Sequence, residues 1–278
     1  PAVLAGLVLL ATDRGAFRLT RRQLLVMAVL GVAGVAIMQA AYATAIQLLP
    51  VGIALLLQYL AVLLVALVAL VVFRERVKTR LWIAIALVLV GLTAVARPWE
   101  ARLDPLGVVM ALAAAVALTL YFVVGERQVA RTSPLAVAFW TMVFATGFWA
   151  FFSGWWELDA ATFIAPVDLG GAWGAWALPL WVPLVVTVVA GSFLPFLLSF
   201  TALKHLTATA AGVVASSEIV FAFAIAWLWL GEALDGVGLV GAGVVLAGIV
   251  LAQTARDSKT VVDAELVLPT PEDVRGRA

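Results

Sequence analysis

Long apolar runs dominate the chain. Eight of them are long enough to cross a bilayer: residues 23–46, 51–73, 80–97, 105–125, 134–152, 179–203, 208–230 and 236–255. A membrane-spanning helix needs about 20 mainly apolar residues, and the runs lack the alternation that barrel strands show. Because only helices and closed barrels satisfy every backbone amide in lipid, the pattern predicts an all-α polytopic membrane protein.

The two ends of the chain differ from these runs. Residues 1–11 are apolar but too short to cross about 30 Å of hydrocarbon. We interpret them as the end of a truncated helix; a signal peptide is the alternative, although no basic region precedes them. Residues 256–278 are polar and contain two prolines, which predicts a disordered tail. The expectation is therefore eight complete membrane-spanning helices and a truncated N-terminal one.

Composition narrows the class of protein. Hydrophobic residues make up 65% and charged residues 12% of the chain, which is more apolar surface than a soluble fold of this size could bury. A net charge of +1 gives no basic field for nucleic acid. Cysteine is absent and His205 is the single histidine, so we expect no disulfide, no metal site and no cofactor. The expected partners are the lipid bilayer and a small-molecule substrate.

Basic residues alternate between the loops and predict the orientation. One set of alternate loops holds nearly all of them: Arg14, Arg18, Arg21, Arg22, Arg74, Arg76, Lys78, Arg80, Arg127, Arg131, Lys204, Arg256 and Lys259. The other set holds Arg97 and Arg102. Because basic loops stay in the cytoplasm, the first set and the C-terminus are predicted to be cytoplasmic.

The segment 153–178 fits the outer side of the membrane. It contains Glu157, Asp159 and Asp168, has no basic residue, and carries four tryptophans. Tryptophan favours the headgroup level of a bilayer. We therefore expect this segment to lie along the outer surface instead of crossing the membrane.

An internal repeat is suggested when the chain is compared with itself at an offset of 157 residues. The offset aligns Gly34 with Gly191, Ala45 with Ala202, Leu49 with Leu206, Glu75 with Glu232, and Gly91 with Gly248. Chance in a composition rich in glycine and alanine is the alternative. The equivalent helices that begin at residues 23 and 179 are five spans apart, so they cross in opposite directions. This is the inverted-topology repeat of secondary transporters, whose binding site lies near the midplane between the halves.

Particular motifs resemble the EamA family of the drug/metabolite transporter superfamily. They are Ser217-Glu218, Leu230-Gly231-Glu232-Ala233-Leu234, the segment from Ala45 to Pro50, and Phe73-Arg74-Glu75-Arg76. The resemblance divides the chain into halves at residues 1–97 and 105–255. It implies a ten-helix fold with cytoplasmic termini and export of amino acids or related metabolites across a bacterial inner membrane. Ile219 stands where family members often have proline, so the local bend of that helix is not carried over.

Glu218 is the main candidate for chemistry. It is the one ionisable acid or base within the eight runs away from their ends, about ten residues from one end of its run and twelve from the other. A charge near the middle of a membrane is costly and is usually functional. A protonated glutamate that only hydrogen bonds between helices is the alternative.

Other polar and aromatic residues at similar depth are weaker candidates for substrate binding. The set is Gln39, Gln58, Tyr59, Tyr42, Trp140, Ser216 and Ser217. The two amides could equally hold helices together, Tyr42 and Trp140 could belong to interfacial aromatic belts, and the two serines could bond back to their own helix. Pro183, Gly191 and Pro195 further predict a kink near Gly191.

These features favour a secondary transporter that exports a small metabolite, an amino acid being the expected class, by alternating access with possible proton coupling through Glu218. A passive channel or facilitator is the alternative. An intramembrane enzyme is less favoured, because the sequence has no GxSxG motif, no histidine at membrane depth and no pair of membrane carboxylates. The sequence does not predict an oligomeric state.

Overall fold

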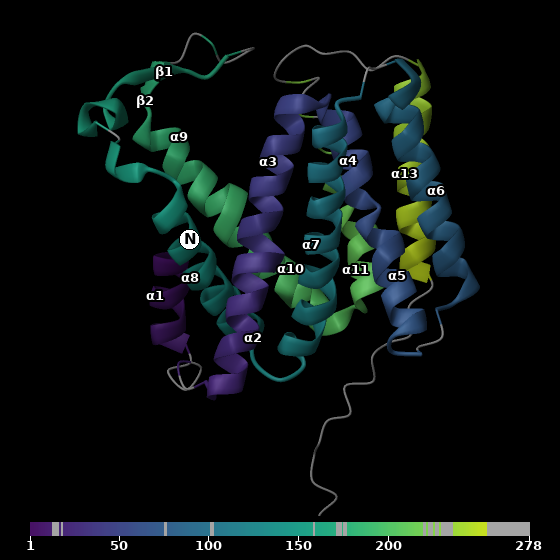
Figure 1. Cartoon of the computed structure of the whole chain (residues 1–278), viewed down its shortest axis with the longest axis horizontal. Coiled ribbons are helices and arrows are strands. Elements are labelled where there is room, and N and C mark those ends of the chain that lie inside the picture. Colours follow the sequence, from purple (N-terminus) through teal and green to yellow (C-terminus); the bar gives the residue numbers. More distant parts are fainter. Residues whose placement is uncertain are drawn as a thin grey trace, which may run out of the picture.

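The computed structural model describes residues 1–12, 17, 19–74, 77–100, 103–157, 159–170, 174, 177–218, 221, 225, 228 and 236–254. These residues form a bundle of helices that run between two ends of the molecule (Figure 1). The helical elements are α1 (Ala2–Thr12), α2 (Arg21–Gly31), η2 (Val32–Ile37), α3 (Met38–Leu48), α4 (Val51–Tyr59), α5 (Ala61–Val71), α6 (Thr79–Ala96), α7 (Pro105–Val129), α8 (Pro134–Phe152), α9 (Trp181–Val186), η7 (Thr187–Phe193), α10 (Leu194–His205), α11 (Ala208–Ala215) and α13 (Gly236–Thr254).

The helices coincide with the apolar runs and confirm a helical membrane protein. Five described helical segments are long and apolar enough to cross a membrane: Arg21–Leu48, Val51–Val71, Pro105–Val129, Pro134–Phe152 and Trp181–His205. Thr79–Val95 and Gly236–Ala252 are shorter apolar helices at two further predicted positions. The run 208–230 is described mainly up to Glu218, so the count of eight complete spans stays a prediction. The predicted tail 256–278 lies outside the described residues.

Local sequence signals set where the helices begin. Thr20 and Gln23 form a capping box at the start of α2, in which each side chain bonds the backbone of the other. Asp104 caps α7, and its carboxylate accepts bonds from the N–H groups of Leu106 and Gly107. Pro105 then fills the first helical position, where no N–H is needed. These caps fix the ends of the long helices at the two ends of the bundle.

The described chain is mostly helical, in agreement with the predicted all-α class, and contains in addition one short pair of strands that was not predicted. Strands β1 (Pro166–Asp168) and β2 (Ala177–Pro179) pair antiparallel, with Val167 opposite Leu178. The helix predicted to begin at residue 179 therefore begins at Trp181. The segment after α8 lies beyond the helical bundle, where it forms short 3-10 turns and the paired strands (Figure 1).

An irregularity occurs at the predicted kink. Residues Thr187–Phe193 form a π-helical segment that includes Gly191 and joins α9 to α10. Pro195 has no N–H to bond the carbonyl of Gly191, which removes one regular α-helical bond there. A second π-helical segment, η2, joins α2 to α3 and contains Gly34, the residue 157 positions before Gly191. The sequence did not predict η2.

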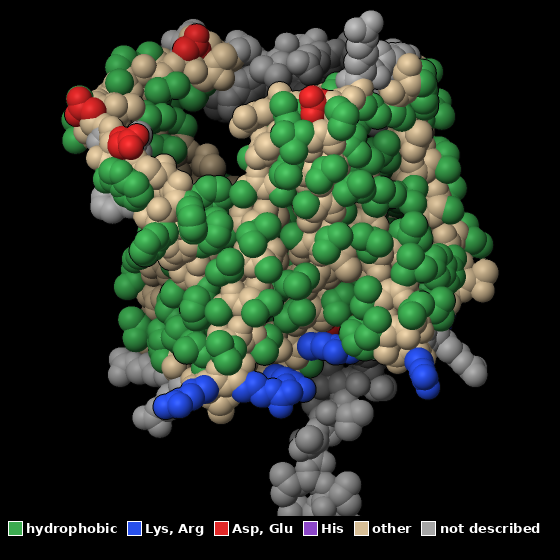
Figure 2. Space-filling view, in the orientation of Figure 1, with side chains coloured by type: hydrophobic (Ala, Val, Ile, Leu, Met, Phe, Trp, Pro, Cys, Tyr) green, Lys and Arg blue, Asp and Glu red, His purple; other side chains and the backbone are tan. Residues whose placement is uncertain are grey.

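Charged residues separate between the two ends of the bundle. Figure 2 shows Lys and Arg side chains at one end of the visible face and Asp and Glu side chains mainly at the other. We call these the basic end and the acidic end. The connections after α5, α7 and α10 lie at the basic end, and the β1–β2 segment lies at the acidic end (Figure 1). The two sets of alternate loops distinguished in the sequence therefore lie at opposite ends of the bundle.

Helices α6 and α13 pack through glycines at very close range. A Cβ on Gly91 would lie 2.7 Å from the carbonyl oxygen of Gly241, and one on Gly248 would lie 2.9 Å from the carbonyl oxygen of Ala84. Such distances leave no room for a side chain, because the opposing atoms belong to the backbone. Small residues of this kind let membrane helices approach closely.

Candidate functional site

A cavity of about 540 Å³ lies within the bundle. Its walls come from α3, α4, α7, the η7–α10 segment, and α11 with the residues that follow it. The lining residues are Met38, Tyr42, Leu55, Gln58, Tyr59, Leu118, Tyr121, Phe122, Gly191, Pro195, Phe196, Ser199, Ala215 and Glu218. The volume is in the range of about 300–1,000 Å³ that is usual for sites of small molecules. We call it the central cavity.

Glu218 is hydrogen bonded at the wall of the central cavity. The hydroxyl of Tyr59 lies 2.7 Å from Oε2 of Glu218 and 3.0 Å from the carbonyl oxygen of Ala215. Tyr59 is buried, whereas Glu218 is exposed, so the carboxylate is held by a fixed partner yet is open to a ligand. The helix assignment breaks at Leu60, just after Tyr59, and at Ser216, just after Ala215. The pair therefore joins two helices where both are interrupted.

Gln58 offers an unused acceptor beside this pair. It is only 9% exposed, and its Oε1 atom has no hydrogen-bond partner among the described residues. Leaving a buried acceptor unpaired costs about 1–3 kcal/mol. Gln58 precedes Tyr59 on α4 and lines the same cavity. A ligand or water that donates a hydrogen bond would satisfy this oxygen.

Aromatic side chains make much of the remaining wall. The ring of Tyr121 packs edge-on against Phe196, at 5.9 Å between centroids, and against Phe122, at 5.4 Å. Ser199 hydrogen bonds the Tyr121 side chain. Tyr42 of α3 lies within electrostatic range of Glu218. The cavity thus combines one carboxylate with several aromatic faces, a combination that suits a cation with an apolar body.

The structure brings together four of the predicted site residues and separates the others. Glu218, Gln58, Tyr59 and Tyr42 all line the central cavity. Gln39 instead lines a neighbouring cavity of about 210 Å³ with Trp149 and Ser192. These placements favour the four cavity residues as a common site.

The remaining predicted residues lie elsewhere. Trp140 packs against Phe139 and Phe144, away from the residues that line the cavities described here. The buried Ser216 donates its hydroxyl hydrogen to the carbonyl oxygen of Val213, on its own helix, as the structural alternative supposed. Ser217 adjoins Glu218 without lining the central cavity.

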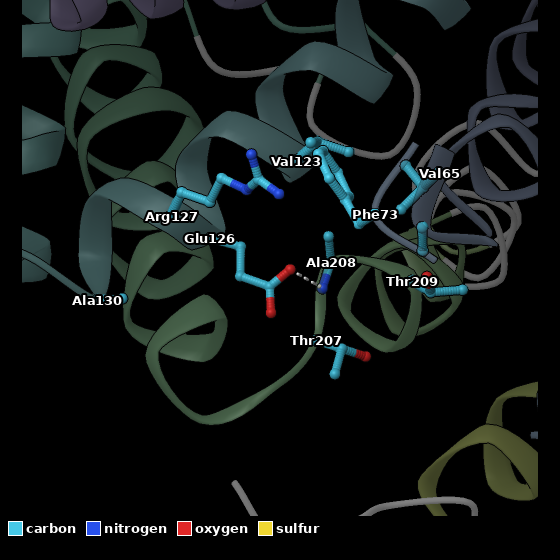
Figure 3. Close-up of a pocket in the computed structure, with 10 residues that line it drawn as sticks. Val65, Phe73, Val123, Glu126, Arg127, Ala130, Thr207, Ala208 and Thr209 are labelled. Atoms are coloured by element: carbon cyan, nitrogen blue, oxygen red, sulfur yellow. Dashed lines mark hydrogen bonds between the residues drawn. The ribbon is translucent and has the colours of Figure 1, made fainter. Parts of the chain in front are cut away.

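A smaller cavity of about 190 Å³ lies at the basic end (Figure 3). Oε2 of Glu126, on α7, accepts a bond of 2.9 Å from the N–H of Ala208, the first residue of α11. The guanidinium of Arg127 stacks on the ring of Phe73, 3.5 Å from its centroid. We call this space the basic-end cavity. It was not predicted.

Metal binding has no support in the described part of the chain. No group of three His, Asp or Glu side chains gathers there in a way that could hold a metal ion. The charged groups that line the two cavities are the carboxylates of Glu218 and Glu126 and the guanidinium of Arg127.

The family model of EamA-like transporters matches residues 1–97 and 105–254. The chain belongs to this family. The sequence resemblance to EamA proteins is thereby confirmed, and with it a multi-pass membrane transporter of the drug/metabolite type. Among curated proteins no sequence matches this EamA-like chain.

Solved structures share the fold of this EamA-like transporter, and 28 of their chains match it. One of them, described only as "Crystal structure of protein", superposes with a TM-score of 0.71 at 18% sequence identity. The match covers 92% of this chain and 85% of the other. At this identity the likeness shows the fold alone.

Several residues of the EamA-like site escaped the sequence analysis. Tyr121, Phe122 and Phe196 sit in apolar helices, where an aromatic residue resembles an ordinary core or lipid-facing position. Glu126 was missed because its run was predicted to end at residue 125, which placed it in a loop. The helix continues to Val129. Pro134, which begins the next helix, is the signal that could have shown this. The stretch between residue 125 and Pro134 has room for one more turn of α7.

Proposed function

We propose that this EamA-like protein is a secondary transporter that exports a small metabolite carrying an ammonium group, such as an amino acid, by alternating access. The observation that carries the proposal is the carboxylate of Glu218, hydrogen bonded to Tyr59 and open to the central cavity. A carboxylate at this depth is stable when a cation or a proton accompanies it. Among the residues that line the cavity none is Lys or Arg, so a ligand cation is the natural counterpart.

The neighbouring groups support an ammonium ligand. An ammonium has three N–H donors, and the cavity presents the oxygens of Glu218 together with the unpaired Oε1 of Gln58. Tyr42, Tyr121 and Phe196 could cover the rest of the molecule. A substrate with a phosphate group fits less well, because phosphate is usually matched by arginine or lysine.

Alternating access is supported by signs of an inverted repeat. At the offset of 157 residues, α4 begins at Val51 and α11 at Ala208, and the residues before them, Leu49 and Leu206, share the same extended backbone. The segment α2–α3 runs from the basic end to the acidic end and α9–α10 runs back (Figure 1).

The packing of α6 against α13 supports the same repeat. Gly91 meets Gly241, and their counterparts Gly248 and Ala84 also meet. Contacts that exchange in this way are those of a two-fold axis. Because α6 and α13 are antiparallel in Figure 1, the axis would lie across the helices and thus in the membrane plane. Transporters with inverted repeats alternate largely by rocking of one repeat against the other around the substrate site.

The basic end is proposed to face the cytoplasm of a bacterial inner membrane, with the C-terminus on that side. The support is the gathering of Lys and Arg at one end of the bundle. Figure 2 also shows the surface hollowed at the acidic end, beside the β1–β2 segment. The central cavity would then be open toward the outside, which is the state that releases an exported substrate.

Proton coupling would follow if Glu218 binds both the proton and the ammonium group of the substrate. Glu218 cannot hold a proton and a substrate ammonium at the same oxygen, so each would displace the other. Export of a cation would then exchange for protons from outside. A passive channel would need neither the exchange nor saturation.

Flux into inverted vesicles or proteoliposomes tests the function. We suggest two labelled probes of equal apolar body, phenylethylamine and L-phenylalanine, measured with and without an imposed pH gradient. We expect saturable, gradient-dependent flux of at least one probe, lost in Glu218→Gln at equal protein level. Flux that stays linear with concentration and ignores the gradient would favour a channel. Normal gradient-driven flux in Glu218→Gln would remove Glu218 from the mechanism.

A further inference from the structure

Another cavity at the basic end is lined by α2 and α7 and has a volume of about 430 Å³. Three arginines border it: Arg22 of α2, Arg127 of α7, and Arg131 in the turn after α7. None of its lining residues is Asp or Glu, and Glu126 lines the basic-end cavity instead. We call this space the arginine cavity. Like charges around one space repel each other, and an anion bound between them would relieve the repulsion.

The helix ends at the arginine cavity do not decide the sign of its potential. Helix α2 begins there with its positive end, and α7 ends there with its negative end, so the two contributions oppose each other. The carbonyl of Gln128 in the last turn of α7 already accepts bonds from the N–H groups of Arg131 and Thr132. The arginine side chains therefore set the potential, which favours an anion.

Gln128 adds a hydrogen-bonding group to the wall of the arginine cavity. The residue is only 6% exposed, and its side chain forms no hydrogen bond to a described residue. Its amide is not among the buried polar atoms that lack a partner, so it is reached through the cavity. A side-chain amide has two N–H donors, and a phosphate oxygen can accept them. The site thus has a fixed donor beside its flexible arginines.

The arginines at this end also orient the protein in the membrane. That role requires positive charge near the helix ends, but it does not require a shared cavity or a buried amide. Arg80, at the start of α6, supplies charge at the same end without lining any of the cavities described. Arginine is moreover the residue whose planar fork matches a phosphate group. The grouping around one space therefore points to a ligand as well as to orientation.

An exposed apolar stripe leads from the arginine cavity along α2. Leu25 and Val29 follow Arg22 at spacings of three and four residues, which places the three on one face of the helix. Leu25 is 68% and Val29 is 51% exposed. Because α2 runs inward from the basic end (Figure 1), a lipid could place its phosphate near Arg22 and an acyl chain on the stripe. This favours a phospholipid over a soluble phosphate.

We propose that the arginine cavity binds the phosphate group of an anionic phospholipid from the leaflet at the basic end. Arg22 and Arg131 hold the phosphate oxygens, Gln128 donates a further bond, and an acyl chain lies along Leu25 and Val29. Basic pockets between membrane helices bind such headgroups in other proteins. The inference goes beyond the proposed transport function and does not depend on it, since no residue of the central cavity takes part.

Arg127 has a second contact that shapes its role. Its guanidinium stacks on the ring of Phe73 (Figure 3), and a stacked guanidinium still offers the N–H groups at its edge. Arg127 therefore contributes charge from a fixed position. Because its substitution would also disturb the contact with Phe73, the tests use the other two arginines.

Native mass spectrometry of the purified full chain in a neutral detergent tests the site. The probes are phosphatidylglycerol and phosphatidylcholine with the same acyl chains, and the measured quantity is the Kd of the first bound lipid. We expect phosphatidylglycerol to bind at least tenfold more tightly. Arg22→Gln and Arg131→Gln should each raise its Kd about tenfold, because each removes a bond to a charged group. The matched control Arg80→Gln should leave the Kd unchanged. Equal effects of Arg80→Gln and the two cavity variants would mean diffuse surface charge and would overturn the site.

The amide is tested by Gln128→Leu, which should raise the Kd for phosphatidylglycerol several-fold. Thr119→Val is its control, since Thr119 is a buried polar residue of the same helix whose hydroxyl bonds the carbonyl of Ala115. If the two variants bind the lipid equally well, Gln128 has no part in the site.

Competition distinguishes the two sources of a phosphate group. Glycerol 3-phosphate carries the same group without acyl chains, and at a hundredfold excess we expect it to leave most of the phosphatidylglycerol bound. Leu25→Asn should then raise the Kd for the lipid, because it interrupts the apolar stripe. Complete displacement by glycerol 3-phosphate, with a Kd unaffected by Leu25→Asn, would assign the cavity to a soluble phosphate and overturn the lipid.

Discussion

The hydroxyl of Tyr59 lies within hydrogen-bonding distance of two acceptors, Glu218 Oε2 at 2.7 Å and the carbonyl oxygen of Ala215 at 3.0 Å. A tyrosine hydroxyl has one hydrogen to donate. When Glu218 is charged, Tyr59 donates to it. When Glu218 is protonated, it can donate to the Tyr59 oxygen, and Tyr59 can turn its hydrogen to Ala215. Under the proposed proton coupling, a change in the charge of Glu218 would therefore alter a backbone hydrogen bond at a helix break.

Tyr59→Phe should separate the role of the hydroxyl from that of the ring. The variant keeps the packing but loses both bonds, and hydrogen bonds to charged groups contribute about 1.5–3 kcal/mol. We expect the KM of the flux assay to rise about tenfold or more. Thr93→Val is the control, since that hydroxyl bonds only the carbonyl of Leu89 on its own helix, outside the cavity. Unaltered kinetics in Tyr59→Phe would exclude a role for the hydroxyl.

Gln58→Leu should make the protein more stable and weaken substrate binding. It removes a buried oxygen that has no partner, so the melting temperature should rise, by the equivalent of about 1 kcal/mol, while substrate affinity falls. Thr141 has the other unpartnered buried oxygen in the described part of the chain, on α8 and away from the central cavity. Thr141→Val should raise the melting temperature without affecting flux. If both variants behave alike in flux, Gln58 does not bind substrate.

Gly91→Ala should weaken the packing of α6 on α13. Its Cβ would fall 2.7 Å from the Gly241 oxygen, and overpacking of this kind costs about 1–3 kcal/mol. We expect a lower melting temperature in thermal unfolding of the purified protein. Gly243→Ala, on α13, would meet no atom within 4 Å and should leave stability unchanged or raised. Equal melting temperatures for the two variants would mean that the contact is not tight.

Single cysteines at Thr79 and Thr162 test the orientation in intact cells. Thr79 begins α6 at the basic end, and Thr162 lies in the exposed 3-10 turn η5 (Ala160–Phe163) beyond α8. An impermeant maleimide added outside should label Thr162→Cys alone. Permeabilised cells give the control, in which both positions should react. Labelling of Thr79→Cys in intact cells would reverse the proposed orientation.

The positions of the helices followed from sequence because lipid imposes a simple rule on the chain. The run 134–152 has the bounds of α8, and the other runs, apart from 208–230, which is only partly described, differ from their helices by a few residues. The rule says nothing about helical register, which depends on bonds between neighbouring turns. The π-helical segment at Val32–Ile37 therefore had no sequence signal, whereas the one at Thr187–Phe193 was marked by Pro195.

The polar residues of the candidate site were predictable from the sequence, because polar side chains are unusual in a membrane helix. Its aromatic residues were not predictable. Glu218 and Gln58 are polar residues in apolar runs, so their cost in lipid made them visible. Tyr121 and Phe196 are ordinary residues for a membrane helix, and only packing shows that they face a cavity. Ser217 was selected from the sequence for its polarity and Trp140 for its size, yet neither lines the central cavity.

The helix that carries η7 is little buried by the rest of the protein before Phe200. In the span Trp181–His205, no residue of the most hydrophobic 18-residue stretch is buried within the protein, although Gly191 and Pro195 line the central cavity. In a bilayer, its exposed apolar faces would contact acyl chains, which act on this helix from the side opposite the central cavity. We therefore expect the lipid composition of the host membrane to influence the width of the central cavity, and a detergent micelle to give a different width.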